Sequence, residues 1–234
     1  IRDSWKTAMA AKDAPSAAAM PLLEARSITK SFLGVTALDH VDFTLNCGEI
    51  HALLGENGAG KSTLIKILTG AYHGFGGSIL LEGQPIAPTS VAEAQTFGIG
   101  TVYQEVNLLE NLTVAENLFL GRQPKRFGLV DRGRMEKDAT NLLSRYGLTI
   151  DVGVPLSAYS AAIRQIIAIA RAVDLSGKVL VLDEPTASLD AREVEMLFGV
   201  LRQLKAEGLG IIVITHFLDQ VYAIADLSLI HISE

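Results

Sequence analysis

The sequence predicts an α/β fold with a parallel sheet at its centre. Three observations support this: short apolar runs alternate with helical patterns, two early segments alternate apolar and polar residues, and a glycine-rich loop follows the first apolar run. The apolar runs lie at 50–54, 99–103, 179–182 and 211–214, the alternating segments at 38–45 and 78–86, and the loop at 55–63. Helices between buried strands imply a parallel sheet covered on both faces, with a small antiparallel β subdomain beside it.

The glycine-rich loop carries the residue types that bind phosphate. Glycine lets the backbone curl so that successive N–H groups point at a phosphate, and the following helix adds its positive dipole end. Lys61 brings a compact charge to the β and γ phosphates, and the Ser62 hydroxyl suits a magnesium ion. The order strand, loop and helix predicts a P-loop NTPase fold that binds a nucleoside triphosphate. The candidate binding residues are Gly55, Glu56, Asn57, Gly58, Ala59, Gly60, Lys61, Ser62 and Thr63.

Composition sets the class of protein. The chain has 234 residues, 49% hydrophobic content and one cysteine, Cys47, which excludes an internal disulfide and fits a reducing compartment. It has no uninterrupted apolar stretch long enough to span a membrane. The net charge of −6 disfavours a nucleic-acid partner, because such binding relies on clustered Lys and Arg. Residues 1–20 are expected to be a disordered or non-native extension, and residues 21–234 the functional domain.

Helical patterns are clearest in three places. Thr113 and Glu116 have the spacing of a capping box, and the region from about 107 to 160 contains no strong strand pattern. We therefore expect a mostly helical subdomain there, inserted between two strands of the core. Two further helices are predicted by apolar residues that share one face: Met135, Ala139, Leu142 and Tyr146, and later Val194, Leu197, Leu201 and Leu204.

Two acids follow the apolar run at 179–182. Asp183 and Glu184 are expected at the carboxyl end of a buried parallel strand, where α/β sheets usually bind ligands. Asp183 is suited to hold magnesium through water. Glu184 is suited to orient or deprotonate a water molecule for in-line attack on a γ phosphate.

The runs GENGAGKST and VLVLDEPTASLD resemble the ATP-binding domain of the ABC transporter superfamily, and the resemblance covers roughly residues 22–226. It implies ATP and Mg²⁺ as ligands and assigns further roles. Phe32 would stack on adenine, Gln104 would contact magnesium and the attacking water, and His216 would sense the γ phosphate. Ser188, Leu189 and Asp190 match the loop that crosses to the opposing subunit.

The family signature, Leu-Ser-Gly-Gly-Gln at the start of a helix, is altered in this chain. Ser160 lies 23 residues before Asp183, as in many members, whereas Ser157 lies 26 before it. The resemblance implies that Ser160 contacts ATP held by the opposing subunit. Ala161, Ala162 and Ile163 replace the two glycines and the glutamine. We expect both added methyl groups to weaken the site that this signature completes, which would leave two sites of unequal activity.

The segments GENGAGKSTLIKILTGAY and TVYQEVNLLENLTVAENLFLGR resemble the first half of sugar-importer ATPases, which carry two such domains in one polypeptide. The resemblance implies membrane permease subunits, a second ABC domain and, indirectly, a periplasmic sugar-binding protein as partners. It also implies a peripheral location at the cytoplasmic face of the inner membrane. The chain is accordingly expected to be truncated before a second ABC domain.

The sequence also allows three rival functions. A non-transport ABC-type ATPase acting on nucleic acid or ribosomes is the main alternative, and the acidic balance disfavours it. A module that holds ATP without hydrolysing it conflicts with the presence of both Glu184 and His216. A simpler P-loop kinase or GTPase would leave the signature helix, Gln104 and His216 unexplained.

Overall fold

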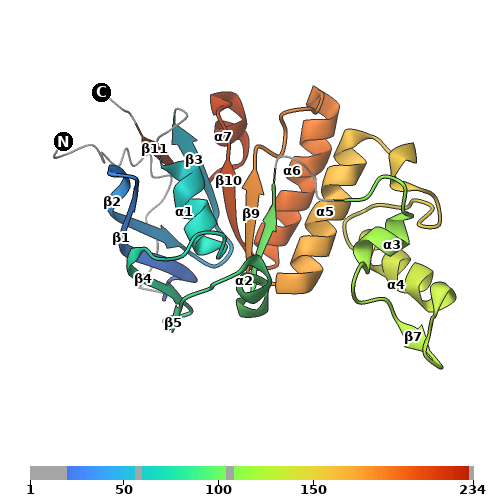
Figure 1. The fold of residues 1–234 in the computed structure, drawn as a ribbon. Coiled ribbons are helices and arrows are strands. Elements are labelled where there is room, and N and C mark those ends of the chain that lie inside the picture. The colour runs from blue at the N-terminus through green and yellow to red at the C-terminus, as the bar shows by residue number, and fades with distance from the viewer. Residues whose placement is uncertain (1–19, 56–59, 104–107, 232–234) are drawn as a thin grey trace.

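The computed structural model describes residues 20–55, 60–103 and 108–231, with the backbone alone described at 227–231. Two larger sheets, a two-stranded hairpin and a set of helices make up these ranges (Figure 1). Residues 1–19 of the predicted extension at 1–20, the loop residues 56–59 and Gln104 lie outside them.

The central sheet is parallel, as predicted. In its described strands the order is β11-β3-β10-β9-β6. The strands are β3 (Ile50–Gly55), β6 (Ile99–Val102), β9 (Val179–Asp183), β10 (Gly210–Ile214) and β11 (Leu227–His231). Because all strands run the same way, β3, β9 and β10 end at one edge of the sheet.

Side chains of the central strands alternate between two hydrophobic clusters. Leu180 and Leu182 face one cluster with α5 and α6, whereas Val179 and Val181 face another with α1 and α2. Layers on both faces explain why these strands read as continuous apolar runs. The helices are α1 (Lys61–Leu68), α2 (Val91–Phe97), α5 (Ala161–Ser176), α6 (Ala191–Ala206) and α7 (Leu218–Ile224).

The antiparallel sheet lies beside α1. Its order is β2-β1-β4-β5, and its buried residues Val41, Phe43 and Leu45 share a cluster with α1. These three are the alternating residues that predicted the sheet. The strands are β1 (Leu23–Phe32), β2 (Val35–Leu45), β4 (Gly76–Leu81) and β5 (Gln84–Ile86).

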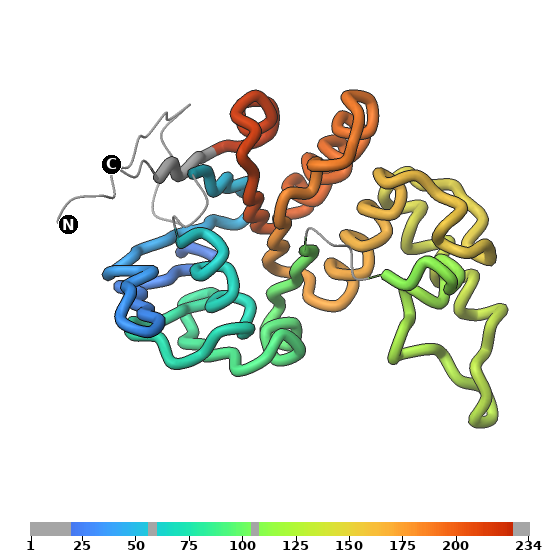
Figure 2. Tube along the Cα trace, turned by 45° about the horizontal axis from the view of Figure 1, so that its top comes forward, coloured from blue at the N-terminus to red at the C-terminus, as the bar shows by residue number. Residues whose placement is uncertain are grey.

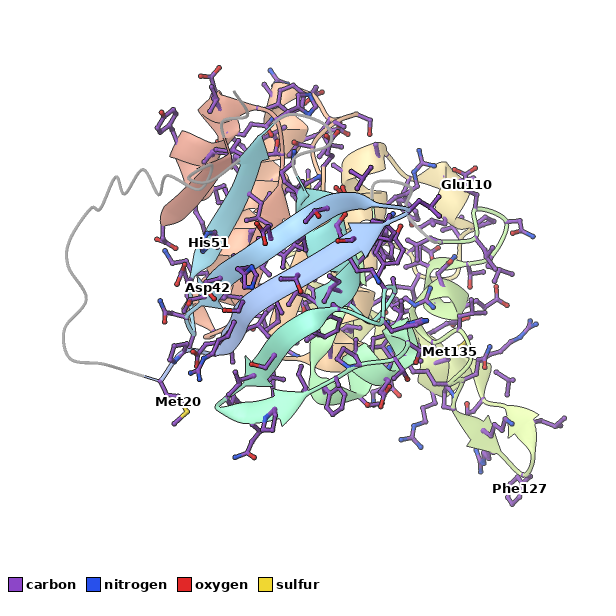
Figure 3. The ribbon with its side chains drawn as sticks, turned by 60° about the vertical axis from the view of Figure 1, so that its left-hand side comes forward. Met20, Asp42, His51, Glu110, Phe127 and Met135 are labelled. Atoms are coloured by element: carbon purple, nitrogen blue, oxygen red, sulfur yellow. The ribbon has the colours of Figure 1, made fainter. Side chains whose placement is uncertain are left out.

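A mostly helical segment lies on the opposite side of the central sheet from the antiparallel sheet (Figures 1 and 2). Both bonds of the predicted capping box form, between Thr113 and Glu116 at the start of α3. The structure adds a hairpin that the sequence did not predict, because strands of two residues carry no periodic signal. Phe127 lies at its tip, away from the body (Figure 3). The elements are α3 (Val114–Leu118), β7 (Lys125–Arg126), β8 (Leu129–Val130), α4 (Arg132–Ser144) and a 3-10 turn (Leu156–Ala158).

Candidate nucleotide site at the carboxyl edge of the parallel sheet

Lys61 stands at the start of α1, directly after the glycine-rich loop. Its ammonium Nζ donates to the backbone oxygen of Gly55 at 2.5 Å, so it reaches the end of β3. Gly60 is the N-cap of α1 with φ 81°, and a Cβ there would lie 2.8 Å from the carbonyl oxygen of Ala37. Both features require glycine. The candidates Glu56, Asn57, Gly58 and Ala59 lie outside the described residues.

The buried face of α1 orients the phosphate-binding end of the helix. Leu64, Ile65, Ile67 and Leu68 are buried, so the helix is anchored by its apolar stripe. Ser62 is exposed and Thr63 half-buried in the first turn. The first turn and positive dipole end of α1 therefore lie where Lys61 and the Ser62 hydroxyl are, an arrangement suited to phosphate.

Asp183 ends β9 and lies close enough to Lys61 for their charges to interact. Burial is the main cause that raises the pKa of Asp183, and the neighbouring Glu184 raises it further; Lys66 and Lys61 oppose both. Burial lowers the pKa of Lys61, against the attraction of Glu184 and Asp183. The fold thus brings Lys61, Asp183 and Glu184 close enough for their charges to interact.

Glu184 and His216 come together from the ends of two neighbouring strands. His216 Nδ1 forms a 2.9 Å hydrogen bond with Glu184 Oε1. The backbone N–H of Glu184 donates to the Ile214 oxygen at 2.9 Å, which continues the pairing of β9 and β10 past the sheet. Glu184 has φ 46°, a conformation rare for a residue with a side chain. The backbone is therefore turned so that the carboxylate meets the imidazole.

The residues present fit a magnesium nucleotide. A half-buried Asp183 whose pKa is raised by burial and by a second acid is a carboxylate that a cation would stabilise. Among the described residues, no cluster of three or more His, Cys, Asp or Glu is placed to hold a metal by itself. Magnesium is commonly bound through one or two carboxylates and completes its shell with water and phosphate oxygens, a role that Asp183 fits. Ser62, a second predicted ligand, lies in the first turn of α1, and Gln104, the third, lies outside the described residues.

Phe32 ends β1 and is 39% exposed. Its ring packs edge-on against Tyr72 with centroids 5.3 Å apart, and the Lys30 ammonium lies 5.2 Å from its centroid. The same ammonium donates to the backbone oxygens of His73 and Gly74, at 2.7 and 3.0 Å, which ties β1 to the segment after α1. The Phe32 ring is therefore partly exposed and is held in place by Tyr72 and Lys30. Sequence reasoning missed Tyr72 and Lys30, because neither belongs to a motif.

Ser160 is the N-cap of α5, and its hydroxyl makes no capping hydrogen bond. The side chain is exposed, while its backbone oxygen accepts from Arg164 N at 3.0 Å. The expectation for the two alanines needs correction. Ala161 is half-buried, but Ala162 has 0% exposure and is covered by this chain's own residues. Since the second position of the helix faces inward, the Ala162 methyl does not lie on the surface that a partner would meet.

The start of α5 borders a pocket of about 600 Å³ that extends to the segment after β9. Arg164 forms an ion pair with Glu110 at 2.5 Å beside it, and Figure 3 shows where Glu110 lies.

Asp190 has a structural task in this chain: its Oδ1 accepts from the N–H groups of Arg192 and Glu193 and so caps α6. The cap fixes the end of the loop that includes Ser188 and Leu189.

Fold and site together define a P-loop nucleotide-binding domain, and comparison with known proteins narrows the class. The family model described as "ABC transporter" matches residues 38–187, and this chain belongs to that family. A curated relative named "Galactofuranose transporter ATP-binding protein YtfR" from Escherichia coli (strain K12) is 62% identical over 205 residues. "Ribose import ATP-binding protein RbsA 1" from Rubrobacter xylanophilus is 56% identical over 206 residues.

The matches cover most of this chain but less than half of those relatives. Each alignment spans 88% of this chain and 41% of the relative. Among solved structures, a nucleotide-free ATP-binding cassette of an ABC transporter is 29% identical with a TM-score of 0.80, covering 91% of this chain and 88% of that one. A cassette in its ADP conformation matches with the same identity, coverage and TM-score.

Proposed function

We propose that this chain is an ATP-binding and ATP-hydrolysing domain that energises sugar import through a membrane permease. The observation that carries the proposal is the convergence of Lys61, Asp183, Glu184 and His216 at one edge of the parallel sheet. The names of the relatives at 62% and 56% identity support sugar import. A module that only holds ATP would not need the Glu184–His216 pair.

Each side chain has a task that follows from its position. Lys61 and the first turn of α1 bind the β and γ phosphates. Asp183 and Ser62, with Gln104, would hold Mg²⁺, whose charge balances the phosphates when it is bound. Glu184 uses Oε1 toward His216 and so keeps Oε2 for the attacking water, whose proton it accepts. Phe32 offers the partly exposed ring on which adenine stacks.

The other half of the site would come from a second ABC domain. Ser160 carries an exposed hydroxyl with no capping bond, which suits donation to the γ phosphate held by that domain. Asp190 and the loop before it would face the same neighbour. Permease subunits would hold the pair at the cytoplasmic face of the membrane, with a periplasmic sugar-binding protein delivering substrate. Within the described ranges, no helix is long and apolar enough to cross a bilayer.

The printed names of the relatives differ in their sugar: galactofuranose, ribose, fructose and arabinose. The highest of these identities, 62%, is to the galactofuranose relative, and we propose galactofuranose as the first sugar to test. No residue of the site described above is placed to read a sugar, so the permease and binding protein would select it.

The test uses the full reading frame that contains this chain, assembled with its permease in proteoliposomes. We expect ATP-dependent uptake of sugar, and loss of both ATP binding and uptake in Lys61→Ala. The exposed Lys137 on α4 provides the control Lys137→Ala, which removes a lysine without touching the loop. ATP hydrolysis stimulated by RNA or ribosomes, without uptake of any sugar, would support the non-transport alternative.

A further inference from the structure

The segments after β9 and β10 are joined by a third contact besides the two that involve Glu184. The Thr186 hydroxyl donates to Gln220 Oε1 at 2.5 Å. Thr186 is 4% exposed, so this hydroxyl is a buried donor satisfied by a side chain 34 residues later in the sequence. A buried hydroxyl without a partner is costly, so the contact is favoured in the folded state.

Gln220 lies in the first turn of α7, a helix that begins two residues after His216. The helix has seven residues, too few to be stable alone, and its position depends on tertiary contacts. Val221 and Ile224 lie on its buried side, whereas Leu218 and Tyr222 are 51% and 80% exposed. The apolar contacts hold one side of α7, and the Gln220–Thr186 bond holds its first turn.

His216 lies in the short segment between β10 and α7, so the position of α7 affects the position of the His216 side chain. The Phe217 N–H donates to Thr215 Oγ1 at 3.2 Å, and the ring centroid of Phe217 lies 4.0 Å from that of His216. The imidazole therefore contacts both the Glu184 carboxylate and the Phe217 ring. A shift of the first turn of α7 would carry Phe217 with it and loosen the hydrogen bond to Glu184.

Thr186 is also close to Glu184, which is the hydrogen-bond partner of His216. It lies two residues after Glu184, in a turn where Ala187 N donates to the Glu184 oxygen at 3.3 Å and Leu189 N to the Thr186 oxygen at 3.1 Å. Glu184 itself has a left-handed backbone that its surroundings must maintain. The hydrogen bond between Thr186 and Gln220 thus connects the segment that carries Glu184 to the segment that carries His216.

We propose that Thr186 and Gln220 are positioning residues that hold His216 against Glu184 in the geometry needed for hydrolysis. The proposal rests on the ATPase function proposed above. Neither residue needs to touch the nucleotide. Their effect is on turnover, because the phosphate-binding residues Lys61 and Ser62 lie on a different element, α1.

The experiment compares matched variants in the full assembly. Thr186→Val keeps shape and removes the hydroxyl, Thr186→Ser keeps the hydroxyl, and Gln220→Leu removes the acceptor. We expect Thr186→Val and Gln220→Leu to lower kcat about tenfold, with the KM for ATP changed less than about twofold. Thr186→Ser should retain the wild-type kcat. The double variant should lose no more than either single one. Tyr222→Ser, on the exposed side of α7, is the control and should leave kcat unchanged.

Turnover is expressed per folded nucleotide-binding site, and the unfolding midpoint of each variant is measured in parallel, so that loss of folded protein is separated from loss of rate. Normal kcat per site in Thr186→Val or Gln220→Leu overturns the positioning role. So do fully additive losses in the double variant. A wild-type assembly without ATPase activity would overturn the proposed function as well, whereas an active wild type with unaffected variants overturns the positioning role alone.

Discussion

The carboxyl edge of the parallel sheet and the start of α5 differ in how their polar groups are paired. At the sheet edge, Lys61 reaches the Gly55 oxygen and Glu184 reaches His216. At the start of α5, the Ser160 hydroxyl is exposed and caps nothing. The first region is built from contacts within this chain, whereas the second presents a hydroxyl that makes no capping hydrogen bond to its own helix. Such a division is what we expect of a site completed by two domains.

The largest effect should come from Glu184→Gln, which tests the sheet edge. The amide keeps the shape of the side chain and a hydrogen-bonding oxygen for His216, but it cannot accept a proton from water. We expect ATP binding to persist and single-turnover hydrolysis to fall roughly 10²- to 10⁴-fold. Unchanged hydrolysis would show that the carboxylate is not the base and that the sheet edge only binds.

A smaller effect should come from Ser160→Ala, which tests the other region. In a paired assembly, loss of a hydroxyl that donates to a charged phosphate should reduce hydrolysis roughly tenfold or more. Ser157 is also exposed and lies three residues earlier, so Ser157→Ala is the matched control and should be silent. The reverse result would assign the signature to Ser157 and place it outside the first turn of α5.

The two alanines after Ser160 should separate stability from activity. Ala162→Gly removes a fully buried methyl and should lower the free energy of unfolding by about 1–2 kcal/mol. Ala161→Gly, at a half-buried position, should cost less and should raise ATP turnover in the paired assembly. Denaturant unfolding and steady-state ATPase assays measure both. If neither glycine changes turnover, the altered signature does not make the two sites unequal.

The finest test is the pH dependence of Asp183→Asn. Burial and Glu184 raise the pKa of Asp183 above its ordinary 3.8, so ionisation of this carboxyl costs stability as the pH rises through the raised pKa. Without nucleotide, the asparagine variant should melt at a higher temperature than wild type near neutral pH. The difference should shrink as the pH falls towards 3.8. Thermal melts across pH would contradict this if the wild type were the more stable protein at neutral pH.

Periodicity and local motifs predicted most of the fold. Apolar alternation identified β2, and the Thr113–Glu116 capping box formed at α3 as expected. Motifs predicted Lys61, Asp183 and Glu184, the family resemblance implied His216, and the structure brings these four residues into one region. The β7–β8 hairpin escaped prediction because its strands are too short to show a period. The inward direction of Ala162 escaped because it depends on which face of α5 packs against its neighbours.

What the sequence by itself determined is the identity of the chemical groups and the elements that carry them. The glycine loop requires its residue types locally, and the acids follow a strand whose apolar run is visible in the sequence. Only the tertiary structure decided which distant groups meet: Glu184 with His216, Thr186 with Gln220, and Phe32 with Tyr72. Those contacts depend on the order of strands in the sheet and on helix packing, which no local pattern encodes.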